Sequence, residues 1–101
     1  MSSAARERPL RLPEKLKAIR EALGLSQGGI LIRLGYDGSQ VTRSVISKYE
    51  LGKREPSLLV LYAYAQAANI IADVLLDDEL DLPVLIPSPE KSMGRKRRTK
   101  A

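Results

Sequence analysis

The chain has 101 residues and a net charge of +5, and it contains neither cysteine nor histidine. The lack of cysteine excludes disulfides and thiolate metal sites, and the lack of histidine removes the commonest general base and metal ligand. We therefore expect a protein that is not an enzyme and that needs no metal or other cofactor. The first sixteen residues hold no apolar stretch of the length that a signal peptide requires, which predicts a cytoplasmic location.

Charge is distributed unevenly along the chain. Residues 1–56 carry eleven Lys/Arg against six Asp/Glu, residues 57–90 carry six acids and no basic residue, and residues 91–101 carry six basic residues and no acid. The basic front is where a polyanion such as nucleic acid would dock. Charge alone is equally compatible with ordinary solvated faces.

An all-α domain of five helices is predicted at residues 13–80, after a flexible arm at residues 1–12. The arm is rich in Ser, Ala, Arg and Pro, which is typical of a mobile terminus. The first helix, at residues 13–23, opens with a proline, which suits a first helical turn. Lys15 is expected to point away from the apolar face of this helix. That face is formed, at helical spacing, by Leu16, Ile19 and Leu23.

The second helix is predicted at residues 26–34, with the Ser26 hydroxyl as its N-cap. Gly28 and Gly29 stand in its first turn, where each glycine costs about 1 kcal/mol relative to alanine. This helix is therefore weak by itself and needs tertiary packing. Residues 36–40 follow with turn-forming types, among them an Asp-Gly pair that tolerates positive φ.

The third helix carries the residues of greatest interest. It begins at Thr42, or at Ser39 if the preceding turn joins the helix, and it ends near Leu51. Val45 and Tyr49 lie along an inner row and are expected in the core. The largely opposite side carries four polar side chains, Arg43, Ser44, Ser47 and Lys48.

The fourth helix is apolar on both faces. It is predicted at residues 58–68 after a cap at Ser57, and a left-handed Asn69 ends it. A short fifth helix follows at residues 72–76. A membrane span across this apolar stretch is rejected because Asp73 lies within it, and an aspartate in mid-bilayer costs roughly 2.5–3.5 kcal/mol. A helix that is apolar all round is more simply a buried one, so part of this region is expected to pack against a second copy of the chain.

The chain beyond the fifth helix is predicted to be a tail. Residues 81–101 are expected to be extended or disordered, since each proline disfavours a helical residue before it and the last residues are a basic low-complexity run. Basic side chains at the two ends either contact DNA phosphates or only improve solubility. They are Arg6, Arg8 and Arg11 in front and those of residues 95–100 behind.

Taken in order, the pieces LKAIREALGLSQ, VTRSVISKYELGKREPS and LYAYAQAANI resemble a lambda-repressor-like (Cro/cI-type, XRE-family) helix-turn-helix domain over residues 16–76. The resemblance depends on SQ at the start of the second helix combined with IS-x-x-E-x-G-K-x-x-P-S at fixed spacing. It departs from the family by five extra residues, 36–40, between the second and third helices. The resemblance implies a five-helix, all-α fold, to which the composition adds flexible basic tails at both ends. It also implies a sequence-specific transcriptional regulator, a repressor that binds double-stranded DNA as a homodimer.

The resemblance implies roles for individual residues. Arg43 matches a position that reads base edges, and its guanidinium can bond guanine O6 and N7 together. Arg20 and Glu50 match a family pair that forms a buried ion pair between the first and third helices. The serine at 47 and the two cations after the third helix can also be ordinary solvated residues. The implied DNA contacts are Gln27, Thr42, Arg43, Ser44, Ser47, Lys48, Lys53 and Arg54, with Gln40 added if the third helix starts at Ser39.

Two other classes of function stay open on the sequence alone. The fold can serve as a protein-interaction module, or as an antitoxin that grips a toxin, with the apolar fourth and fifth helices or the C-terminal segment holding the partner. A metal-dependent enzyme would need the acidic cluster of Asp77, Asp78, Glu79 and Asp81 as ligands, although a solvated acidic turn is the simpler interpretation. No membrane association is expected.

Overall fold

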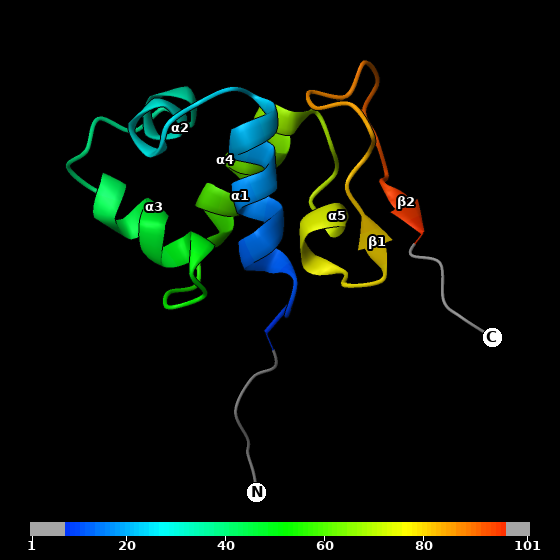
Figure 1. Ribbon diagram of the computed structural model, residues 1–101, viewed down its shortest axis with the longest axis horizontal. Helices are drawn as coiled ribbons and strands as arrows, with labels where there is room; N and C mark the ends of the chain where they lie inside the picture. Colours follow the sequence, from blue (N-terminus) through cyan, green and yellow to red (C-terminus); the bar gives the residue numbers. More distant parts are fainter. Residues whose placement is uncertain (1–7, 97–101) are drawn as a thin grey trace, which may run out of the picture.

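The computed structural model describes residues 8–96, which form five helices in the predicted order and two short strands (Figure 1). The helices are α1 (Leu12–Ala22), α2 (Gln27–Arg33), α3 (Arg43–Glu50), α4 (Leu58–Ala68) and α5 (Asp73–Leu76), and the strands are β1 (Leu80–Asp81) and β2 (Arg95–Lys96). Each strand has two residues. The predicted all-α, five-helix fold class is confirmed.

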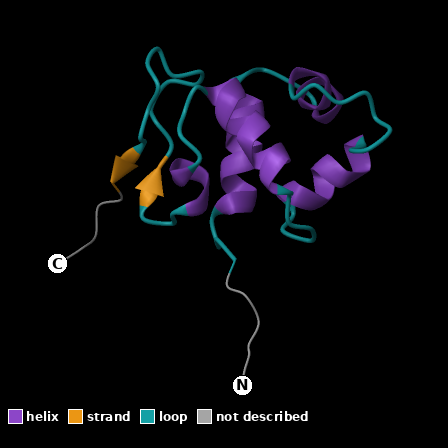
Figure 2. Cartoon of the chain, turned by 180° about the vertical axis from the view of Figure 1, so that it is seen from behind, coloured by secondary structure: helices purple, strands orange, loops and turns teal. Residues whose placement is uncertain are grey.

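α1 stands at the centre of the molecule, with α2 and α3 on one side and α5 and the two strands on the other (Figure 1, Figure 2). α1 contacts α3, α4 and α5, and α2 packs on α3. The core forms where these helices meet, because their apolar faces turn toward one another. Its fully buried side chains include Leu16, Ile19, Ile30, Ile46, Tyr64 and Val74.

Three helices begin where the sequence predicts, because a hydroxyl side chain caps each of them. The Oγ of Ser26 accepts a hydrogen bond from the backbone N–H three residues on at 2.9 Å. The hydroxyls of Thr42 and Ser57 do the same at 3.2 and 3.3 Å. Asn69 ends α4 with a φ of 56°, the predicted left-handed conformation.

The cap at Thr42 decides between the two possible starts of the third helix. Ser39 is held by Asp37 instead, since Asp37 Oδ1 accepts from the Ser39 N–H at 2.9 Å and from the Ser39 hydroxyl at 2.6 Å. These bonds close a turn and lower the pKa of Asp37. α3 is therefore the shorter of the two alternatives, and Gln40 lies in the connection before it rather than on the helix.

Lys15 contradicts the expectation that it points away from the core. The residue is only 2 % exposed. Its Nζ donates hydrogen bonds to the carbonyl oxygens of Val74 at 2.7 Å and Asp77 at 2.9 Å. These carbonyls belong to α5 and to the residue that follows it, where a helix leaves acceptors without intrahelical partners. Burial lowers the pKa of Lys15.

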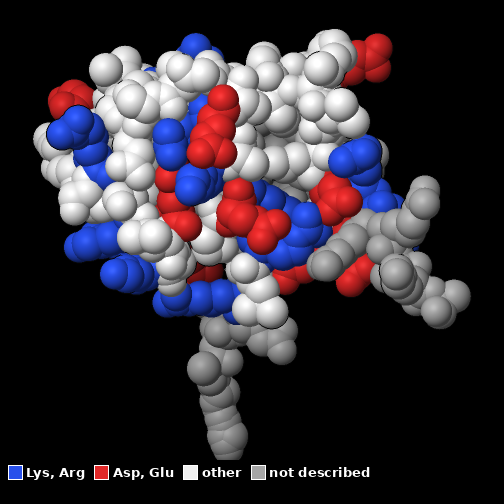
Figure 3. Space-filling view, viewed as in Figure 1, with Lys and Arg blue, Asp and Glu red and all other residues white. Residues whose placement is uncertain are grey.

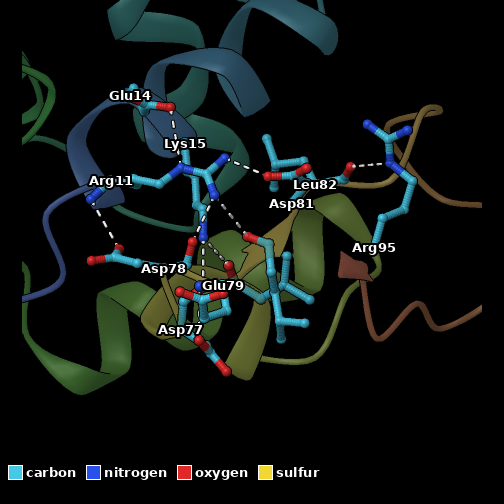
Figure 4. Close-up of polar contacts among 11 residues, drawn as sticks. Arg11, Glu14, Lys15, Asp77, Asp78, Glu79, Asp81, Leu82 and Arg95 are labelled. Carbon is cyan, nitrogen blue, oxygen red and sulfur yellow. Dashed lines mark hydrogen bonds and ion pairs between the residues drawn. The ribbon is translucent and has the colours of Figure 1, made fainter. Parts of the chain in front are cut away.

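Two acids that follow α5 hold the start of α1 (Figure 4). The carboxylate of Asp78 accepts hydrogen bonds from the N–H groups of Leu10 at 2.9 Å and Arg11 at 3.0 Å, and these bonds lower its pKa. Arg11 Nη2 donates to Asp81 Oδ1 at 2.6 Å. The end of the predicted flexible arm is thus anchored, and Arg11 is bound within the protein rather than offered to phosphates. Residues 1–7 lie outside the described part.

Residues 81–96, predicted as an extended or disordered tail, contain no helix but lie against the domain, which the sequence did not predict. β1 and β2 pair in antiparallel fashion, and the segment between them returns to the end of α4. The N–H of Ser88 donates to the carbonyl oxygen of Ala68 at 2.9 Å, and Asn69 Nδ2 donates to the carbonyl oxygen of Ser88 at 2.8 Å. The segment docks because it supplies partners to polar groups at a helix end. Residues 97–101 lie outside the described part.

α4 buries one side and exposes the other. Tyr64 is fully buried, whereas Leu58 is 79 %, Leu59 75 % and Tyr62 58 % exposed. A helix with apolar residues on its solvent side leaves a surface that a partner can cover. Among residues 8–96, no helix has the length and apolar character needed to cross a membrane.

Candidate nucleic-acid interface

α3 turns one side toward the core and leaves the other open. Tyr49 is 5 % exposed, as helical periodicity predicts for the inner row. Val45, also expected in the core, is only half-buried, and Ile46 beside it is fully buried instead. Burial also raises the pKa of the Tyr49 hydroxyl. The exposed or half-buried residues of the open side are Arg43, Ser44, Ser47 and Lys48.

An open groove, which we call the α2–α3 groove, is lined by residues from α2, from the connection that follows it, from α3 and from the turn after α3. It brings together seven of the nine side chains that the sequence predicts to contact DNA, although they come from separate parts of the chain. These seven are Gln27, Thr42, Arg43, Ser44, Ser47, Lys48 and Lys53.

The other two predicted contact residues lie elsewhere. Gln40 and Arg54 border a separate hollow together with Tyr36 and Glu55. The inclusion of Gln40 depended on a third helix that started at Ser39, and the Thr42 cap removes that premise. Arg54 is exposed in the turn between α3 and α4, next in sequence to Lys53 of the groove.

Basic side chains gather along the lower left edge of the molecule, below α3, while acidic and basic side chains alternate over its centre (Figure 3). Lys48, Lys53 and Arg54 are exposed basic residues of α3 and the turn that follows it. Clustered positive charge attracts a phosphate backbone and releases the counterions bound to it. The side of the molecule that carries α3 is therefore electrostatically suited to nucleic acid.

A buried ion pair holds α3 against α1. Arg20 Nε donates to Glu50 Oε2 at 2.7 Å, and Arg20 Nη2 donates to Glu50 Oε1 at 3.0 Å. The side chain of Glu50 is 4 % exposed and that of Arg20 is 14 % exposed. The hydrogen bond to Glu50 raises the pKa of Arg20. Glu50 is thus engaged inside the protein, although it belongs to the segment whose other side is open.

Gln27 joins the same cluster, which the sequence did not indicate. Its Nε2 donates to Glu50 Oε1 at 3.3 Å. Arg20 Nη1 in turn donates to the carbonyl oxygen of Leu25, just before α2 begins. One carboxylate therefore links α1, α2 and α3, and it fixes the start of α2 relative to the open side of α3. A sequence pattern can indicate a polar residue at the start of a helix, but it does not indicate which distant residue that side chain contacts.

Leu51 is a lining residue of the α2–α3 groove that the sequence reasoning missed. It follows α3 directly and is 63 % exposed. An apolar side chain in such a groove suits contact with a thymine methyl group. In the sequence, the only feature that could have pointed to Leu51 is that it is an apolar residue followed by a polar turn.

These features define a class of protein. Two helices, α2 and α3, are joined by a connecting segment, and the second helix offers a polar, cationic side to solvent. This is the arrangement of a helix-turn-helix, whose second helix enters the DNA major groove.

A protein-family model described as helix-turn-helix matches residues 16–72. The match covers more than half of the chain, and the chain belongs to this Cro/cI-type, XRE family. At the level of the family, it is a DNA-binding transcriptional regulator. No curated protein matches the chain.

Proposed function

We propose that this chain is a sequence-specific repressor that reads the major groove of double-stranded DNA with α3 and acts as a homodimer. The observation that carries the proposal is the α2–α3 groove, in which the open side of α3 lies beside Gln27 and Lys53. Repression needs no further activity, because a dimer bound over a promoter excludes other proteins from it. A cytoplasmic location stays a prediction.

The side chains in and beside the groove are proposed to make two kinds of contact, with base edges and with phosphates. Arg43, Ser44 and Lys48 are the exposed side chains of α3 and would reach base edges, where an arginine can bond guanine at two points. The remaining polar groups would contact phosphates, which set the register of the protein on the duplex. They are Gln27, Thr42, Ser47 and Lys53 in the groove, together with Arg54, which follows Lys53 and lies outside it.

Selection of bound fragments from a random DNA pool tests this proposal. The expected result is one enriched, nearly palindromic sequence whose half-sites lie about 34 Å apart, one helical turn of DNA. In that sequence, Arg43→Ala should relax a single base position and weaken binding by about 1–3 kcal/mol. A pool without an enriched sequence would refute sequence-specific reading.

The homodimer is proposed to form through α4. Leu58, Leu59 and Tyr62 form an exposed apolar surface on consecutive turns of that helix. We expect a dimer in sedimentation at micromolar concentration and a monomer for Leu59→Asp. Leu85→Asp is the matched control, because Leu85 is 63 % exposed but lies in the C-terminal segment. A monomeric wild type, or a dimer that survives Leu59→Asp, would contradict this surface.

A protein-interaction module, for example an antitoxin, is the second candidate function. The observation that favours it is a set of exposed apolar residues outside the helices, Val84, Leu85 and Met93. This alternative predicts a stoichiometric protein partner that Leu85→Asp releases while DNA selection is unaffected. Retention of such a partner by Leu85→Asp would count against the C-terminal segment as its binding site.

A further inference from the structure

The side chain of Arg43 lies across the first turn of α2, directly over Gly28. A methyl group added at the Gly28 Cα would stand 3.0 Å from Arg43 Cδ and 3.8 Å from Arg43 Cγ. Carbon atoms in comfortable contact lie about 3.5–4.0 Å apart. The aliphatic stem of Arg43 therefore occupies part of the space that any larger residue at position 28 would take.

The backbone gives no separate reason for glycine at this position. Gly24 and Gly35 have φ values of 71° and 94°, which only glycine adopts easily, and an added methyl group there would meet nothing within 4 Å. Gly28 is not among the glycines with positive φ. It lies inside a helix, where glycine is less favourable than every residue except proline. The contact with Arg43 is thus what distinguishes Gly28.

Its neighbour Gly29 provides the contrast. A methyl group there would lie 3.3 Å from Cβ and from Cδ2 of Leu25, and 3.3 Å from the Ser26 Oγ that caps the same helix. Gly29 therefore serves the packing of its own capped turn. An added methyl group approaches the Ser26 Oγ at both positions, at 3.9 Å for Gly28 and 3.3 Å for Gly29, but the nearest atoms at Gly28 belong to a side chain of α3 and those at Gly29 do not.

We propose that Gly28 is a positioning residue for Arg43, and this rests on the proposed function of α3 as the reading helix. Because Gly28 has no side chain, the arginine stem can rest against the first turn of α2. This contact limits the directions that the Arg43 guanidinium can take. An arginine has many rotamers, and a two-point bond to guanine needs one orientation. Support in the free protein reduces the conformational entropy lost on binding. Gly28 would thereby sharpen base discrimination without touching DNA.

The test compares Gly28→Ala with Gly29→Ala and Arg43→Ala, using the selected DNA site and its single-base variants. Arg43→Ala identifies the base position that Arg43 reads. At that position Gly28→Ala should lose about a factor of ten in discrimination, and Gly29→Ala should lose none. Gly28→Ala should cause no further loss when added to Arg43→Ala. The melting temperature of Gly28→Ala alone should not fall below that of the wild type, because alanine favours the helix and the arginine stem can move aside.

A second measurement follows the arginine without DNA. The Nε–Hε resonance of Arg43 should be distinct from that of a solvated arginine in the wild type and in Gly29→Ala, and should move to the solvated position in Gly28→Ala. The role of Gly28 would be overturned if Gly28→Ala kept the base discrimination and the Arg43 resonance of the wild type. It would also be overturned if Arg43→Ala had the same base preference as the wild type. A wild type with no base preference at all would instead refute the proposed function and, with it, any part of Gly28 in reading.

Discussion

Replacement of Arg20 tests how the open side of α3 is held in place. In Arg20→Met the Glu50 carboxylate loses hydrogen bonds of 2.7 and 3.0 Å and keeps the one from Gln27 at 3.3 Å. Breaking a buried ion pair by removing one partner costs about 3–5 kcal/mol, because the other charge stays buried without compensation. The arginine end of the pair is 14 % exposed, so water reaches it and we expect about 3 kcal/mol.

This loss is large enough to measure by thermal unfolding. A change of 1 kcal/mol shifts the melting temperature of a domain of this size by about 4–8 °C, so Arg20→Met should melt about 12–24 °C lower than the wild type. Arg33→Met is the matched control. Arg33 is an exposed arginine of α2, and its replacement should change the free energy of unfolding by less than about 0.5 kcal/mol.

A double variant separates the buried charge from the packing. Arg20→Met combined with Glu50→Leu removes both charges, and such replacements of buried pairs are often neutral or stabilising. We expect it to recover most of the lost melting temperature. The reasoning is refuted if Arg20→Met melts like the wild type, or if the double variant is as unstable as Arg20→Met alone.

Three further predictions concern the groove, the anchor of α1 and the C-terminal segment. Lys53→Ala should weaken binding to all sequences alike and flatten the slope of log affinity against log salt concentration by about 0.9, and an unchanged slope would exclude a phosphate contact. Asp78→Asn should lower the free energy of unfolding by about 1 kcal/mol near pH 7, because the carboxylate accepts two backbone hydrogen bonds that depress its pKa. Since the pKa is depressed, this stability is present above the unfolded-state value of about 3.9 and is lost as the pH falls through the folded-state value. Urea titrations of wild type and variant should then converge in acid, and a gap that persisted there would contradict the assignment. Gly94→Ala should cost about 1–3 kcal/mol in calorimetry, since φ is 80° and an added methyl group would lie 2.7 Å from the carbonyl oxygen of Asp81. Equal stability would show that the C-terminal segment is not held tightly there.

The sequence by itself determined where the helices begin and in what order they come. The caps at Ser26, Thr42 and Ser57 satisfy backbone N–H groups three residues away, so each can be recognised within a few residues of sequence. The helical spacing that placed Tyr49 on the inner row likewise identified the buried side of α3, because helical periodicity is a local property. Packing decided that Ile46 rather than Val45 is the fully buried neighbour. These local signals are also the ones that carry the resemblance to the family.

Tertiary structure decided which of the polar residues remain open to solvent. Arg11 and Lys15 look like surface cations in the sequence, but α5 and the residues after it pack against α1 and supply their acceptors. Arg11 bonds the carboxylate of Asp81, and Lys15 bonds the carbonyl oxygens of Val74 and Asp77. The docking of residues 81–96 on the end of α4 and the position of the Arg43 stem over Gly28 arise in the same way. Each depends on how two segments far apart in the chain pack together. Residue types within a short stretch of sequence do not indicate which distant segment will pack against it.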